Sequence, residues 1–128
     1  MSKAPVPPSE EQAEAWRASG ARLRELRQAA GLSQEALSIG VDMDQSTLSK
    51  MERMGLHLGS RKRIAEIAEE LGARVRIVIR DRDGHTVRHE ALTGARSSLS
   101  TLARQAAASG EIVGLEIEPK NASEAVGR

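Results

Sequence analysis

The sequence predicts an α+β fold, in which an N-terminal helical bundle is followed by a small β-β-α-β region. From residue 9 to residue 71, apolar side chains recur at the three- and four-residue spacing of amphipathic helices. From residue 74 to residue 80 the spacing changes to two, the period of a strand with one apolar face. The dipeptide Asp83-Gly84 then favours a tight hairpin turn. Helices therefore give way to strands near residue 72.

The composition excludes several kinds of protein. The chain of 128 residues has no cysteine, which excludes a disulfide scaffold, a thiolate zinc site and a cysteine nucleophile. Trp16 is its only aromatic residue, so stacking of single-stranded nucleic acid on aromatic rings is nearly excluded. The formal net charge is +1, so any contact with nucleic acid must come from a local basic patch.

The sequence also argues against a bound metal or cofactor and against insertion into a membrane. The histidines lie too far apart for a recognisable short metal motif, and we expect no metal and no other cofactor. No apolar run approaches the roughly 20 residues that span a bilayer, and the first ten residues lack the apolar segment of a secretory signal. We therefore expect no membrane contact and a cytoplasmic protein.

Four helices are expected in the N-terminal part, over residues 9–30, 33–40, 45–54 and 61–71. Their expected N-cap residues are Ser9, Ser33, Asp44 and Ser60. Trp16 belongs to the apolar stripe of the first helix and is expected in the core or in dimer packing. Gly20 interrupts that helix and marks either a break or a close packing contact.

The C-terminal part is expected to contain a strand over 74–80, a weaker strand over 85–91, a helix over 93–109 and a strand over 111–118. The predicted organisation is a flexible arm at 1–8, a helical domain at 9–72, a β-β-α-β domain at 73–118 and a disordered tail at 119–128. The arm contains three prolines, which disfavour a helix.

Two short helices joined by a tight turn, over 33–40 and 45–54, have the spacing of a helix-turn-helix unit. Over residues 21–72 the chain resembles the Cro/C1-type (XRE, lambda-repressor-like) helix-turn-helix DNA-binding family. The matching residues are Leu23 to Arg27, Gly31 to Glu35, Leu37, Gln45 to Glu52, and Leu71 with Gly72. The resemblance implies a bundle of four or five helices that binds a double-stranded DNA operator, usually as a homodimer.

The resemblance also implies which residues meet DNA. They are Gln34, Gln45, Ser46, Thr47, Ser49, Lys50, Arg53, Arg61 and Lys62. The amide of Gln45 can donate to and accept from an adenine edge at once, and Lys50 can reach guanine or a phosphate. Arg61 and Lys62 begin the fourth helix, where free amides and the helix dipole favour a phosphate.

Two further expectations follow from the same resemblance. Arg27 and Glu52 match a structural ion pair between the first and third helices. Asp42 stands where the family most often has a turn glycine, and an aspartate adopts the left-handed backbone less easily than glycine.

The strand over 74–80 is expected to pair across a dimer axis, with Val75, Ile77 and Ile79 as dimerisation residues. Similar proteins have a strand directly after the fourth helix that does this, and an exposed edge here would be unstable alone. Its arginine-bearing face leaves two alternatives open, a β-ribbon that reads DNA and a merely solvated surface.

We therefore expect a sequence-specific transcriptional regulator, a dimeric repressor of its own operon that binds an inverted-repeat operator through a recognition helix at 45–53. The alternative is an antitoxin or adaptor, whose C-terminal region binds a protein partner such as a toxin. No phosphate-binding loop, nucleophile elbow or carboxylate–histidine cluster is visible, so we do not expect an enzyme.

Overall fold

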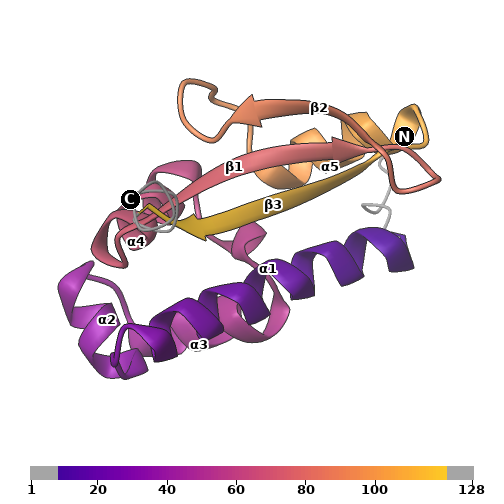
Figure 1. Ribbon diagram of the computed structural model, residues 1–128. Coiled ribbons are helices and arrows are strands. Elements are labelled where there is room, and N and C mark those ends of the chain that lie inside the picture. The colour runs from indigo at the N-terminus through magenta and orange to yellow at the C-terminus, as the bar shows by residue number, and fades with distance from the viewer. Residues whose placement is uncertain (1–8, 121–128) are drawn as a thin grey trace, which may run out of the picture.

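The computed structural model describes residues 9–120. Its elements are α1 (Glu10–Ala29), α2 (Gln34–Gly40), α3 (Gln45–Met54), the short 3-10 helix η1 (Leu56–Leu58), α4 (Arg61–Glu70), β1 (Ala73–Arg80), β2 (Thr86–Ala91), α5 (Leu99–Ala108) and β3 (Ile112–Pro119). Helices and sheet are both present in the expected order, and the fold class is α+β (Figure 1).

Serine hydroxyls start four of the helices. Ser9, Ser33, Ser60 and Ser98 each accept a hydrogen bond from the backbone N–H three residues later, at 3.0–3.1 Å. Such a bond satisfies one of the donors that the first turn of a helix leaves free. The first three of these caps confirm the expected helix starts, whereas Asp44 precedes α3 without a side-chain cap bond.

The expected helix over 93–109 begins later than the sequence indicated. Residues 92–98 form a loop, and α5 starts at Leu99 after the cap at Ser98. Gly94 has a φ of 96°, which a helix cannot contain. The error arose because the apolar stripe of α5 gives no sign of where the helix begins.

The three strands form an antiparallel sheet in the order β2-β1-β3, so β1 is the central strand (Figure 1). Both of its edges are hydrogen-bonded within the chain. Ile77 and Ile79 are fully buried in the core, and Val75 packs against it. The prediction that β1 pairs across a dimer axis through Val75, Ile77 and Ile79 is therefore wrong, because a central strand has no free backbone groups to offer.

The opposite face of β1 carries the arginines. Arg76 and Arg80 reach Glu116 of β3 at 2.8 Å and 3.5 Å, and His89 of β2 lies 3.9 Å from the same carboxylate. Val78 lies on the same polar face and is nevertheless fully buried. Two of the three arginines on this strand, Arg76 and Arg80, thus form ion pairs within the sheet.

One hydrophobic core joins the helices to the sheet. It contains Leu23 of α1 and Leu48 of α3 together with Ile77 of β1 and Leu102 of α5. Helix α1 also binds β3 directly, because the side-chain amide of Gln12 donates to the carbonyl of Val113 and accepts from its N–H. The change at residues 72 and 73 is therefore a change of secondary structure and not a boundary between two separately packed domains.

The two predicted terminal segments fall largely outside the described residues, the arm at 1–8 entirely. Of the predicted disordered tail at 119–128, Pro119 ends β3, and the N–H of Lys120 donates to the carbonyl of Gly72 at 2.8 Å. The prediction of disorder is wrong for these two residues, and residues 121–128 lie outside the described part.

Candidate nucleic-acid interface

The turn between α2 and α3 sets the angle between the two helices. Asp42 takes the left-handed backbone with a φ of 52°, as the expected turn position requires. The N–H of Met43 then donates to the carbonyl of Ser38 at 2.9 Å, which closes the turn. An aspartate tolerates this conformation better than most residues, because its short polar side chain can satisfy nearby backbone groups.

Helix α3 has one buried face and one polar face. Leu48 and Met51 are fully buried and hold the helix on the core. The side chains of the polar face are Gln45, Ser46, Thr47, Lys50 and Arg53, all exposed, with Ser49 half-buried beside them. The first two turns of α3 therefore present hydrogen-bond donors and acceptors outward on a rigid element.

The last part of α3 is fixed by the expected ion pair. Arg27 of α1 donates to both carboxylate oxygens of Glu52, from Nε to Oε2 at 2.5 Å and from Nη2 to Oε1 at 3.0 Å. Its third nitrogen donates to the carbonyl of Leu32 at 2.8 Å. The hydrogen bond that Arg27 donates to Glu52 raises the pKa of Arg27 above its ordinary value.

Gln34 belongs to the same cluster. Its Nε2 donates to Glu52 Oε1 at 3.0 Å, and the side chain is half-buried. The bond connects the first residue of α2 to α3 and orients the amide. The sequence predicts that Gln34 contacts DNA, and this stays a prediction; the structure shows its amide bonded to the Arg27–Glu52 ion pair.

The three basic residues at the start of α4, Arg61 to Arg63, have different environments. Arg61 is buried, and its guanidinium donates to the carbonyls of Ser97 at 2.7 Å and Leu92 at 3.0 Å. The prediction that Arg61 contacts DNA is therefore wrong, because this side chain holds the loop before α5. Lys62 is exposed and stays a candidate. Arg63 donates to the carbonyl of Val41, which ties α4 to the turn.

Helix α1 packs closely against both α3 and η1. Gly20 of α1 lies so close to α3 that a Cβ there would stand 2.6 Å from the carbonyl oxygen of Glu52 and closer still to that of Met51. The ring of Trp16 stacks on His57 of η1 at a centroid distance of 4.6 Å and an interplanar angle of 13°. The first contact confirms the close-packing alternative for Gly20, and Trp16 is buried as a core residue.

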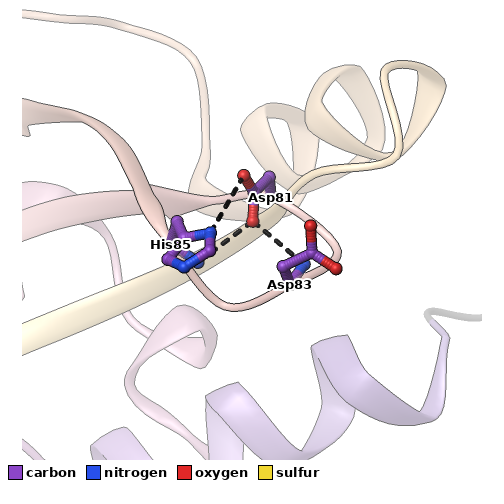
Figure 2. Close-up of side chains that lie close together, drawn as sticks. All are labelled: Asp81, Asp83 and His85. Atoms are coloured by element: carbon purple, nitrogen blue, oxygen red, sulfur yellow. Dashed lines mark hydrogen bonds and ion pairs between the residues drawn. The ribbon is translucent and has the colours of Figure 1, made fainter.

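A cluster of Asp81, Asp83 and His85 lies in the β1–β2 hairpin (Figure 2). Its three ligand atoms lie within 4.8 Å of one another. One oxygen of Asp81 accepts from the backbone N–H of Asp83 at 2.9 Å and from that of His85 at 3.0 Å. These bonds shape the hairpin turn, so we assign the cluster a structural role.

Comparison with known families agrees with this geometry. Residues 19–80 match the family model of a helix-turn-helix domain, a segment that contains α2, α3, α4 and β1. No curated protein and no solved structure matched the chain. None of the helices in the described range 9–120 has the length and apolar character needed to cross a membrane.

Proposed function

We propose that the helix-turn-helix domain makes this protein a sequence-specific transcriptional regulator, a dimeric repressor that controls its own operon. The observation that carries the proposal is the polar face of α3, which is exposed while the opposite face is fully buried. A helix held in this way can enter the major groove, which is about 12 Å wide, while α2 lies across the backbone.

Each exposed residue of α3 has a chemistry suited to duplex DNA. The amide of Gln45 can donate to the ring nitrogen and accept from the amino group of an adenine, which distinguishes that base from the others. Lys50 lies about one and a half turns further along and can reach a guanine or a phosphate. Ser46 and Thr47 carry short hydroxyls for phosphate oxygens, which position the helix without reading sequence.

The charges around the helix support selective binding. Asp42 and Asp44 are exposed next to the polar face and repel phosphates that approach there. The net charge of the chain is only +1, so attraction to any duplex regardless of sequence is weak. Lys62 and Arg53 supply the local positive charge. Affinity then depends on the hydrogen bonds that α3 makes to bases.

The experiment measures binding of the purified protein to the DNA upstream of its own gene and to a duplex of the same composition in scrambled order. We expect the upstream duplex to bind at least about 10³ times more tightly, as specific regulators do, with a footprint of inverted-repeat symmetry. Equal affinity for the two duplexes would contradict the proposal.

The antitoxin or adaptor alternative is tested by co-expression with the neighbouring genes. Recovery of a stable complex with one of their products would favour it over a repressor that acts alone. Both proposals describe a binding protein and no enzyme, and both use α3 in the same way.

A further inference from the structure

The sheet has two outer edges, β3 and β2, and within the described residues helix α1 is bonded only to the β3 edge. At the β3 edge, Gln12 bonds both backbone groups of Val113, and Arg22 donates to the carbonyl of Ile117 at 3.1 Å. Helix α1 therefore closes this edge. The β2 edge lies on the far side of the sheet from α1 (Figure 1). In β2 only Glu90 is half-buried, and the other five residues are exposed.

Among residues 9–120, no strand pairs with the outer edge of β2. The strand registers identify the backbone groups that this edge presents. Val113 and Ile117 direct their backbone groups to α1, so the alternation of an antiparallel ladder directs Ile77 and Ile79 of β1 toward β2. Their partners on β2 are Glu90 and Arg88. The alternating residues His89 and Ala91 therefore turn their N–H and C=O groups outward.

We propose that the β2 edge is a homodimer interface, in which β2 strands from two copies pair antiparallel about a twofold axis at His89. The two three-stranded sheets then form one sheet of six strands. His89 lies opposite His89 of the second copy as a hydrogen-bonded pair, because both residues direct their backbone groups outward. Unpaired edges of this kind are templates for pairing with another chain.

The charges of β2 select this register. With the axis at His89, Arg88 of each copy lies opposite Glu90 of the other, and opposite charges facing each other across strands are favourable. The next registers that keep the hydrogen bonds are shifted by two residues. One places Arg88 opposite Arg88 and the other places Glu90 opposite Glu90, and both are repulsive. The charges of β2 therefore favour antiparallel pairing with a second β2 in this one register.

Two features of the chain agree with this arrangement. Arg88 and Glu90 already approach each other within one copy, Nε to Oε2 at 3.1 Å, so they stand side by side on one face and can exchange partners. Val87, at the bulge of β2, is one of the exposed large apolar side chains and would face Ala91 of the second copy. The proposal rests on the proposed function only in that an inverted repeat needs two copies, since the assembly itself needs no DNA.

The first experiment is disulfide trapping, for which the chain is suited because it has no cysteine. In His89→Cys the paired Cα atoms would stand about 5.5 Å apart, within the range of a disulfide. In the control Ala91→Cys the two Cα atoms would stand roughly 14 Å apart, because they are offset by four residues along neighbouring strands. We expect the full-length His89→Cys protein to form a covalent dimer and Ala91→Cys to stay uncrosslinked. Equal crosslinking of the two variants, or none in either, would overturn the proposal.

The second experiment reverses the charges. Arg88→Glu and Glu90→Arg should each weaken the dimer by roughly tenfold, because like charges then face each other. The double variant should recover it, although the bond from Arg88 to Glu111 is still lost. Sedimentation over a dilution series measures the dimer, and circular dichroism checks the fold. A double variant as weak as the single variants would contradict the register.

DNA binding is measured separately by fluorescence anisotropy on the upstream duplex. If the protein binds that duplex with an inverted-repeat footprint although His89→Cys forms no covalent dimer, the β2 interface is wrong and the proposed function stands. If the dimer forms as expected but binds no DNA, the interface stands and the proposed function is wrong. A strand from another protein could instead add to the same edge and displace the second copy. Sedimentation of the co-expressed complex would reveal this outcome, which would contradict the proposal.

Discussion

Arg27 of α1 and Glu52 of α3 form a bidentate ion pair, and both side chains are buried. The pair joins the first helix to the last turns of α3, and Gln34 adds α2 to the same carboxylate. The exposed polar face of α3 projects from this fixed point. The ion pair therefore sets the position of the polar face without taking part in it.

Removal of one partner of this pair should lower the free energy of unfolding. Arg27→Ala or Glu52→Ala leaves an uncompensated buried charge, and we expect a loss of about 3–5 kcal/mol in the free energy of unfolding. Replacement of both, as Arg27→Met with Glu52→Leu, should cost much less because no buried charge remains. Urea denaturation followed by circular dichroism measures all three. A loss below about 1 kcal/mol in both single variants would show that the charges are solvated.

Loss of the proposed base contacts of α3 should weaken DNA binding without loss of stability. Gln45→Ala and Lys50→Ala should each cost roughly 1–3 kcal/mol in affinity for the operator, and together they should abolish specific binding. Both residues are exposed, so the free energy of unfolding should change by no more than about 0.5 kcal/mol. Gln28→Ala, at an exposed position of α1, is the control. Normal operator affinity in the double variant would remove α3 as the reading helix.

Arg61 and Lys62 are neighbours with opposite expected effects. Arg61→Ala leaves the carbonyls of Ser97 and Leu92 without their donor and should lower the free energy of unfolding by about 1–3 kcal/mol. Lys62→Ala should leave stability unchanged but reduce the salt dependence of DNA binding by about one counterion. Affinity measured across a salt series, together with thermal unfolding, separates the two. The assignment fails if Lys62→Ala has the larger effect on unfolding.

Gly20→Ala should lower the free energy of unfolding, although the same change in an exposed helix would raise it. In an exposed helix this change would stabilise by about 1 kcal/mol through helix propensity. Here the new Cβ meets the carbonyl oxygens of Met51 and Glu52, the latter at 2.6 Å, so overpacking should cost about 1–3 kcal/mol instead. Ala21→Gly, at the exposed position that follows, measures helix propensity alone and should cost about 1 kcal/mol. Chemical denaturation compares both variants with the unchanged protein. A more stable Gly20→Ala protein would show that α1 and α3 are further apart than described.

Stability should fall in mildly acidic solution because of His57. Desolvation lowers the pKa of His57, and its Nδ1 is buried without a hydrogen-bond partner among the described residues. The unfolded chain therefore binds a proton before the folded chain does, and the free energy of unfolding decreases as the pH falls below about 6.5. His57→Phe keeps an aromatic ring against Trp16 but cannot be protonated, so its unfolding should depend less on pH between about 7 and 5. Identical pH profiles for the two proteins would exclude this role.

Much of the helical part could be predicted because its determinants are local. The caps at Ser9, Ser33 and Ser60 bond to residues three positions away, and the apolar stripe of each helix repeats within one or two turns. The polar face of α3 follows from the same periodicity. The Arg27–Glu52 pair was found through the family resemblance and not through local rules.

The remaining errors concern contacts between residues far apart in the chain. Arg61 looked free because the loop that it binds is 31 to 36 positions away. Gln12 likewise binds a strand 101 positions away, a contact about which the sequence made no prediction. No local pattern specifies such partners, since each is chosen by how whole elements pack.

The sequence by itself determined the helix-turn-helix unit, the hairpin and the polar surface of α3, because backbone hydrogen bonding and side-chain periodicity act over a few residues. Only the tertiary structure decided that β1 is central, that α1 closes the β3 edge and that no other described strand pairs with β2. Strand order is a property of the assembled sheet: every strand has two hydrogen-bonding edges, and only packing shows which of them is filled.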